Sequence, residues 1–206
     1  MMFFDIETTT LGAYDYDAKV VLSQTLRDGK LTLLPLWKMS EYDLIMELSE
    51  IFYSLEDYEP VLTYNGGFDF RYITNRISKV MGTEKSRIES RFRIKVKHID
   101  MFQYSDKFMV PLSTVLKIYN IKQENPDYGC VMRQMYELGE FNNIINHGVE
   151  DVELLQDLID KEPLFADGEK IFLDTKLCIQ YGRERRKRMD TLREKYGVKY
   201  EVPKKK

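Results

Sequence analysis

Residues 1–7, Met-Met-Phe-Phe-Asp-Ile-Glu, form a short apolar strand pattern that ends in two carboxylates. Because side chains alternate along a strand, Asp5 and Glu7 project from the same face, about 7 Å apart. So few polar positions are typical of a strand covered on both faces, which predicts that Asp5 is partly buried. Burying two carboxylates costs several kcal/mol unless a cation, such as a divalent metal, compensates. The alternative is a strand that ends at Ile6, with Glu7 solvated and Asp5 capping a turn.

The segments after this strand alternate between strand and helix patterns. Residues 19–26 and 30–36 are apolar-rich strands, and the Asp28-Gly29 pair between them predicts a tight hairpin. In chain order, apolar periodicity predicts further strands at 61–64 and 94–99 and helices at 41–57, 68–81, 112–119, 131–138, 141–161 and 167–195. This order predicts an α/β fold, with a mixed sheet and helices on its faces. We expect that domain to span residues 1–162 and a helical basic extension to span residues 163–206.

The bulk composition narrows the class of protein. The chain has 206 residues, of which 43% are hydrophobic and 13% aromatic, which suits one domain with a large core and excludes a disordered chain. No apolar run approaches the roughly 20 residues of a membrane span, so we expect no membrane partner. Because the chain starts directly in a strand pattern, without room for a signal peptide, we expect a cytoplasmic protein. Cys130 and Cys178 are too few for a disulfide framework.

Charge is distributed unevenly along the chain. Residues 179–206 hold 11 Lys and Arg against 4 Asp and Glu, a net charge of +7, whereas the preceding residues carry −10. Such a tail can contact the phosphate backbone of a nucleic acid, which contributes affinity whatever the base sequence. It can equally lie on its own acidic body or mediate self-association. The basic residues considered for backbone binding are Arg183, Arg185, Arg186, Lys187 and Arg188.

Two further acids are directed inward by helical periodicity. Asp69 falls in the first turn of the helix after Asn65-Gly66-Gly67, and a helical wheel places it on the apolar arc. The helix dipole alone would also favour an acid at this place. His147 and Asp151 lie four residues apart on one face of a long amphipathic helix, on the flank of its apolar stripe. A His–Asp pair at this spacing can also be a simple structural hydrogen bond.

These stretches resemble, in the same order, the motifs of a known family. Phe4-Asp5-Ile6-Glu7-Thr8-Thr9 resembles the first motif of the DEDD 3′–5′ exonucleases of the ribonuclease H-like superfamily. Tyr64-Asn65-Gly66-Gly67-Phe68-Asp69 resembles the second motif, and His147-Gly148-Val149-Glu150-Asp151-Val152 resembles the third. The nearest match is the proofreading exonuclease domain of B-family DNA polymerases and its stand-alone relatives. The resemblance covers about residues 1–160.

The third motif departs from the family pattern at its histidine. In one branch of the family a Tyr precedes the last Asp by four residues, and in another a His precedes it by five. Here His147 stands at the tyrosine spacing. Because one position on a helix turns a side chain by about 100°, the reach of His147 differs from that in either branch.

The resemblance implies a two-metal hydrolysis of phosphodiesters. By similarity, Asp5, Glu7, Asp69 and Asp151 bind two divalent ions, and His147 takes the proton from the attacking water. The hard oxygen ligands favour Mg²⁺ or Mn²⁺.

The resemblance also implies a substrate and the residues that hold it. Thr8, Leu11, Asn65 and Phe68 match positions that line the terminal-nucleotide pocket in relatives. We therefore expect a 3′–5′ exonuclease for single-stranded nucleic acid, DNA in preference to RNA. It would act alone, as a homo-oligomer, or as a recruited subunit of a replication or repair assembly. The alternatives are an endonuclease such as a ribonuclease H or resolvase, and a non-catalytic nucleic-acid-binding subunit.

Overall fold

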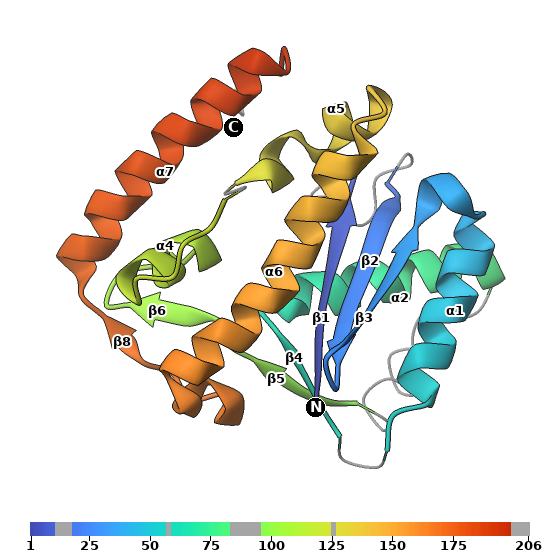
Figure 1. Ribbon diagram of the computed structural model, residues 1–206, viewed down its shortest axis with the longest axis horizontal. Coiled ribbons are helices and arrows are strands. Elements are labelled where there is room, and N and C mark those ends of the chain that lie inside the picture. The colour runs from blue at the N-terminus through green and yellow to red at the C-terminus, as the bar shows by residue number, and fades with distance from the viewer. Residues whose placement is uncertain (11–17, 57–58, 83–95, 125–126, 199–206) are drawn as a thin grey trace.

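A mixed sheet forms the centre of the molecule (Figure 1). The computed structural model describes residues 1–10, 18–56, 59–82, 96–124 and 127–198. The sheet has five strands in the order β3-β2-β1-β4-β5, which are β1 (Met2–Thr8), β2 (Val20–Arg27), β3 (Lys30–Pro35), β4 (Pro60–Thr63) and β5 (Lys97–Asp100). The first three strands are antiparallel, and β4 and β5 run parallel to β1. The predicted α/β fold with a mixed sheet is therefore confirmed.

The hairpin between β2 and β3 forms at the predicted residues. Asp28 and Gly29 have φ angles of 52° and 72°, the left-handed backbone that a two-residue hairpin turn requires. Arg27 pairs directly with Lys30 across the turn. This hairpin leaves β1 in the middle of the sheet, between β2 and β4.

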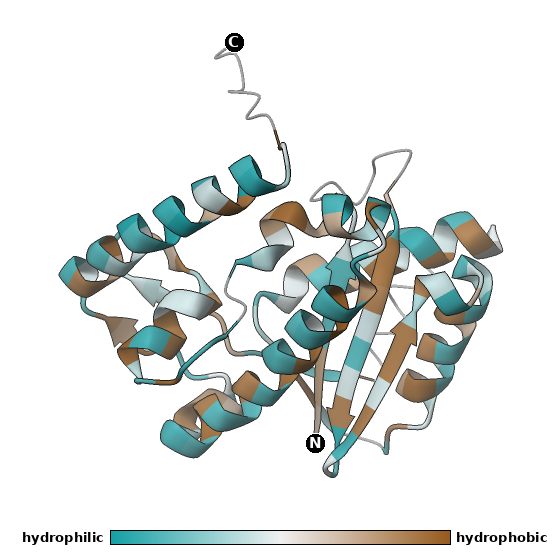
Figure 2. Cartoon of the chain, turned by 45° about the horizontal axis from the view of Figure 1, so that its top comes forward, coloured by the Kyte–Doolittle hydropathy of each residue, from teal (hydrophilic) through white to brown (hydrophobic). Residues whose placement is uncertain are grey.

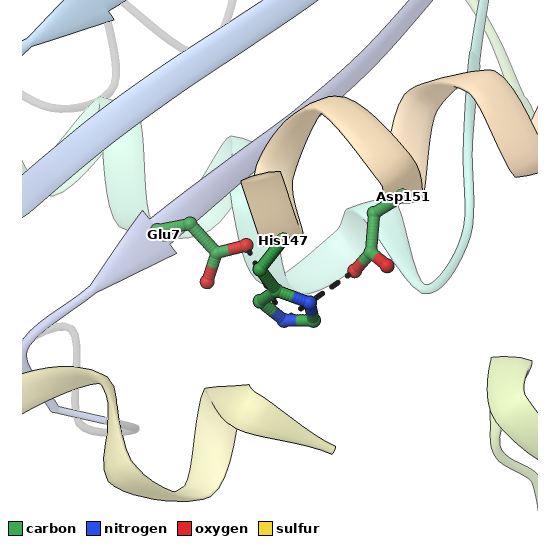
Figure 3. A group of neighbouring side chains, drawn as sticks. All are labelled: Glu7, His147 and Asp151. Atoms are coloured by element: carbon green, nitrogen blue, oxygen red, sulfur yellow. Dashed lines mark ion pairs between the residues drawn. The ribbon is translucent and has the colours of Figure 1, made fainter. Parts of the chain in front are cut away.

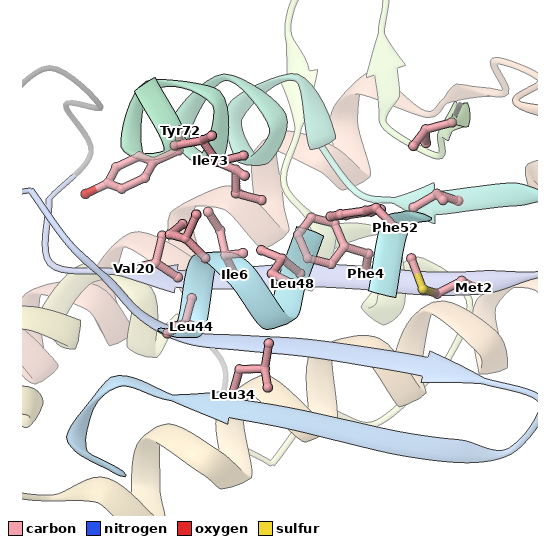
Figure 4. Packing of buried hydrophobic residues seen from close by; sticks show 14 of the residues in the cluster. Met2, Phe4, Ile6, Val20, Leu34, Leu44, Leu48, Phe52, Tyr72 and Ile73 are labelled. Atoms are coloured by element: carbon pink, nitrogen blue, oxygen red, sulfur yellow. The ribbon is translucent and has the colours of Figure 1, made fainter. Parts of the chain in front are cut away.

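One face of the sheet is covered by α1 (Glu41–Tyr53) and α2 (Gly66–Met81). The even-numbered residues of β1, Met2, Phe4 and Ile6, point to this face and join one buried cluster with residues of both helices. Figure 4 shows the Phe4 ring lying against Phe52 of α1, with their centroids 5.1 Å apart. Apolar side chains therefore fill the even-numbered face of β1, and the odd-numbered acids must lie on the other.

The opposite face is covered mainly by α6 (Phe141–Lys161), with α4 (Leu112–Ile118) and α5 (Met132–Glu137) beside it. In Figure 1, α6 crosses in front of the sheet and α2 lies behind it. Phe3 of β1 packs in a cluster with Val152 and Leu155 of α6. Gly148 permits the close approach of α6 to β2, because a Cβ there would lie 2.9 Å from the Gln24 and Leu22 side chains.

The C-terminal region differs from the sequence prediction. The prediction of one continuous helix over residues 167–195 was wrong. Instead, the 3-10 turn η3 (Pro163–Asp167) ends at Gly168, whose φ is 75°, and β8 (Phe172–Leu173) follows. The helix α7 spans Thr175–Lys195, and its N-cap Asp174 accepts a hydrogen bond from the Leu177 N–H.

A second, three-stranded sheet holds β8 in place, in the order β7-β6-β8. Its other strands are β6 (Gln103–Ser105) and β7 (Met109–Val110), which the sequence patterns did not reveal. Phe165, Leu173 and Cys178 are buried in the same cluster as residues of α6. The start of the extension thus packs on the core, and the division after residue 162 stays a prediction.

The last helix is the most hydrophilic of the long helices. Figure 2 shows hydrophilic residues along most of α7, and α7 contacts α4 and the 3-10 helix η2 (Tyr128–Val131). Among the described residues, no helix is long and apolar enough to cross a membrane.

Candidate metal centre

Three elements bring acids together at the carboxyl end of β1. Asp5 and Glu7 project from the odd-numbered face of β1 toward α6, which carries His147 and Asp151. Asp69 comes from the first turn of α2. Glu7 is only 5% exposed and the strand continues to Thr8, so the alternative with a solvated Glu7 is excluded. Asp69 is 3% exposed, as its place on the inward arc of the helix predicted.

His147 lies between two carboxylates (Figure 3). Its Nε2 atom is 3.6 Å from Glu7 Oε1 and 3.7 Å from Asp151 Oδ2. One potential ligand atom from each of these three residues lies within 4.8 Å of the other two. The four-residue spacing on α6 thus places His147 and Asp151 on one face, as predicted, and turns both toward β1.

A buried amide and a half-buried amide hold two of the carboxylates in position. Gln24 lies directly opposite Asp5 in the β1–β2 register and donates a hydrogen bond to Asp5 Oδ2. Gln123 donates to Asp151 Oδ1 at 3.1 Å. Sequence reasoning missed both residues. The signal for Gln24 was a polar residue in the middle of an apolar strand, whereas Gln123 stands in a loop with no pattern around it.

Burial and mutual repulsion raise the pKa values of all four acids. The pKa of Asp5 rises to about 7, because the carboxyl is buried and lies near Asp151. The pKa of Asp151 also rises to about 7, through burial and the neighbouring Glu150. Burial and the charge of Asp5 raise the pKa values of Glu7 and Asp69 well above their usual range. The cluster therefore lacks positive charge, and divalent cations would supply it.

The donor set fits hard divalent ions. Carboxylate oxygens are the ligands that Mg²⁺ and Mn²⁺ prefer, and the acids come from separate rigid elements. Asp100, at the end of β5, has a structural role: it accepts hydrogen bonds from the backbone N–H groups of Asn65 at 2.9 Å and Phe102 at 3.1 Å. It thereby fixes the turn that leads into α2.

The acids open into a pocket of about 490 Å³. The residues expected to hold a terminal nucleotide line this same pocket, namely Thr8, Asn65 and Phe68. Leu11, the fourth of them, lies outside the described residues. The structure thus brings together the described members of the predicted set, and their roles as ligands remain proposals.

Of the five basic residues considered for backbone binding, only Arg185 lines the pocket. Arg185 and Arg188 both pair with Asp127. Arg183, Arg186 and Lys187 do not line the pocket. Arg193 and Asp127 also line the pocket, and sequence reasoning missed both. Asp127 directly follows Asn125-Pro126, a sequence that disfavours regular secondary structure. Nothing in the neighbouring sequence indicates that its partners are distant arginines.

Comparison with known proteins agrees with this geometry. A family model described as RNase_H superfamily matches residues 2–135, a span that includes Asp5, Glu7 and Asp69 but ends before His147 and Asp151. No curated protein matches the chain significantly. Nucleases of this fold use divalent metals and bind nucleic acid, and the carboxylate cluster indicates the same nuclease-type chemistry. The chain therefore belongs to the RNase H superfamily.

Proposed function

We propose that the protein is a metal-dependent 3′–5′ exonuclease that hydrolyses phosphodiester bonds at the 3′ end of single-stranded nucleic acid. DNA is the expected substrate. The observation that carries the proposal is the convergence of four acids on one pocket, where Glu7 and Asp69 are buried and Asp5 and Asp151 are half-buried. The ordered resemblance to the exonuclease motifs supports the direction of cleavage, and the RNase H superfamily match supports hydrolysis of nucleic acid.

Asp5, Glu7, Asp69 and Asp151 would hold the metal ions. When bound there, two divalent ions lower the pKa of the attacking water and stabilise the leaving oxygen. Gln24 and Gln123 keep Asp5 and Asp151 oriented through the hydrogen bonds described above. Ligands held on strands and helices keep their geometry better than ligands on loops, so β1, α2 and α6 are suitable elements to carry them.

His147 is the proposed general base. A neutral imidazole accepts a proton from the attacking water and contributes about 10²–10⁴-fold in rate. The position of Nε2 between Glu7 and Asp151 places it beside the proposed ligands. The same position suits a second role, in which His147 only holds the two carboxylates in place. Excess Mn²⁺ separates the roles, because it should restore the rate of His147→Ala only if His147 merely holds the carboxylates.

The pocket residues would bind the terminal nucleotide. Phe68 offers an aromatic face on which a base can stack, and such stacking does not depend on the base. Thr8 and Asn65 add polar groups along the same wall. We therefore expect cleavage without strong sequence preference.

The competing functions predict different products. An endonuclease of the same superfamily cuts internally, and a binding subunit does not cut. The binding subunit is disfavoured because it has no use for buried, uncompensated carboxylates. The pocket, which α7 borders on one side, suits a strand end.

The test is an assay with single-stranded DNA and RNA, labelled at either end, in Mg²⁺, Mn²⁺ or EDTA. With a 5′ label, a ladder that shortens from the 3′ end is expected with metal and is absent in EDTA. Circular single-stranded DNA provides the control, because an exonuclease leaves it intact. Cutting of the circle would establish an endonuclease instead, and metal-independent or absent cleavage would refute the proposed activity.

A further inference from the structure

One wall of the acidic pocket is basic. Arg185 and Arg193 of α7 line it together with Asp5, Glu7 and Asp151. The two arginines are eight residues apart, which is about 12 Å along the helix axis. Anionic ligands that bind at a cluster of carboxylates need such a positive counterpart, because the acids alone repel phosphates.

A buried aspartate fixes one of these arginines. Arg185 Nε lies 2.6 Å from Asp127 Oδ1, and Arg188 Nη2 lies 3.1 Å from Asp127 Oδ2. The Asp127 side chain is only 2% exposed, and Ser113 Oγ donates to it at 3.2 Å. Asp127 therefore anchors α7 beside the pocket and sets the direction of the Arg185 side chain.

The outer end of Arg185 is available to a ligand. Its side chain is 31% exposed, and Nε faces Asp127. Within the described part of the chain, no other carboxylate pairs with Arg185. A guanidinium has five N–H donors in a planar fork, so the terminal nitrogens can still contact an anion while Nε holds Asp127.

We propose that Arg185, with Arg193 two turns further along α7, binds backbone phosphates of the strand whose end occupies the nuclease pocket. Asp127 is the positioning residue for Arg185. This inference rests on the proposed function, and it adds a substrate-binding element that lies outside the span matched by the RNase H superfamily. Contacts to phosphates carry no base information, in keeping with cleavage that ignores sequence.

The first experiment measures binding of a fluorescent single-stranded oligonucleotide to the full chain at several salt concentrations. Every protein carries Asp5→Asn, so that the ligand is not cut, and Mg²⁺ is present. Arg185→Gln should weaken binding and reduce the slope of log K against log salt by about 0.7 for each lost phosphate contact. The control is Lys176→Gln, which removes the same charge from an exposed position of α7 outside the pocket. Equal slopes in the two variants would overturn the proposal.

The second experiment finds the phosphate. A series of oligonucleotides carries one neutral methylphosphonate at successive positions from the 3′ end. With Arg185 present, neutralising the contacted phosphate should cost affinity, and in Arg185→Gln the same change should cost nothing further. Identical position profiles for both proteins would show that Arg185 contacts no phosphate.

The role of Asp127 is tested by the sign of an effect. If Asp127 acted only through its charge, Asp127→Asn would tighten binding of the anionic strand. Because it positions Arg185, we expect weaker binding and a smaller salt slope. Arg185→Lys keeps a positive charge beside Asp127 but loses the planar fork. Its affinity should therefore lie between those of the unchanged protein and Arg185→Gln, and because the charge is kept it also serves as a control for misfolding. Tighter binding in Asp127→Asn refutes the positioning role.

These results are separable from the cleavage assay. A reduced slope in Arg185→Gln, in a protein that does not cut linear strands, would uphold the phosphate contact and reject the exonuclease. Cleavage from the 3′ end with unchanged slopes would reject the phosphate contact alone.

Discussion

At the scale of single residues, the site is a group of acids that the fold holds close together against their repulsion. Alternation along β1 sends Phe4 and Ile6 to one core and Asp5 and Glu7 toward α6. The even-numbered side chains stabilise the fold, while the odd-numbered acids weaken it until a cation arrives. Stability and activity should therefore respond oppositely to the loss of one acid.

Asp5→Asn should abolish hydrolysis and stabilise the metal-free protein. Asn keeps an oxygen that can accept the hydrogen bond from Gln24, but it removes a buried charge. The free energy of unfolding at neutral to alkaline pH should rise, by an amount on the order of 1 kcal/mol or more. Urea unfolding in EDTA measures the change in stability, and the ladder assay measures the loss of hydrolysis. Near-normal turnover in this variant would exclude Asp5 as a metal ligand.

The metal-free protein should lose stability as pH rises from about 4 to about 7. The pKa values of Asp5 and Asp151 are about 7 in the folded protein, against 3.8 ordinarily. In this range the folded state binds more protons than the unfolded state, so the free energy of unfolding falls with pH. The slope is about 1.4 kcal/mol per pH unit for each such group. Urea unfolding in EDTA at a series of pH values measures it, and the slope should be smaller in Asp5→Asn.

Saturating Mg²⁺ or Mn²⁺ should reverse that loss above pH 7, because metal binds the ionised acids. The added stability should shrink as pH falls and protons compete for the same oxygens. A metal-free protein whose stability is flat or rises across pH 4 to 7 would contradict the burial of these charges.

His147→Ala should reduce the rate by roughly 10²–10⁴-fold while metal remains bound, if His147 is the general base. His147→Tyr should retain part of the activity, because the four-residue spacing is that of the tyrosine branch. The comparison is made at low and at high Mn²⁺. Recovery of most of the rate of the Ala variant in excess Mn²⁺ would show that His147 only holds Glu7 and Asp151 in place.

At the scale of elements, α6 is the helix on which the site depends, and its bounds were predicted fully. Its apolar residues repeat at the helical period over 21 residues. A pattern of this length distinguishes a helix from a strand. The hairpin was equally predictable, because Asp28-Gly29 favours one turn type. In contrast, β8 is only two residues long, and it pairs with β6, almost seventy residues earlier. Pairing of such distant short segments leaves no local pattern, and this is why the start of α7 was misplaced.

The same reasoning explains which site residues could be predicted. The alternation of side chains in β1 and the helical period in α2 and α6 predict the directions of four acids, Asp5, Glu7, Asp69 and Asp151. Gln24, Gln123 and Asp127 act through partners 19, 28 and about 60 residues away. The sequence shows their polarity but not their partners.

Gly148→Ala should test how closely α6 must approach the sheet. The new Cβ would lie 2.9 Å from the buried side-chain ends of Gln24 and Leu22, so either these side chains or α6 must shift, at a cost of about 1–3 kcal/mol. Activity should fall as well, because a shift of α6 moves His147 and Asp151, and a shift of Gln24 disturbs its hydrogen bond to Asp5. Gly182→Ala is the control: a Cβ there meets nothing within 4 Å, and the better helix propensity should stabilise α7 by up to about 1 kcal/mol. Equal unfolding midpoints for the two variants would show that α6 does not need the close approach.

At the scale of the whole molecule, the site joins a region that matches the RNase H superfamily to a region beyond that match. Residues 2–135 supply the sheet and the first three acids. The later residues supply α6, with the last acid, and α7, with two of the arginines that line the pocket, Arg185 and Arg193. Because α7 also buries Cys178 in the core, cutting the chain after Leu177 would disturb folding as well as binding. Point substitutions on α7 are therefore the sharper probes.

The most direct measurement is a crystal structure of the protein grown with Mn²⁺, with anomalous difference maps recorded at the manganese edge. Two peaks are expected in the pocket, bounded by Asp5, Glu7, Asp69 and Asp151, and crystals of Asp5→Asn should lack at least one of them. A map with no peak among these four acids, or with a single ion held by His147 Nε2, would contradict a two-metal nuclease centre.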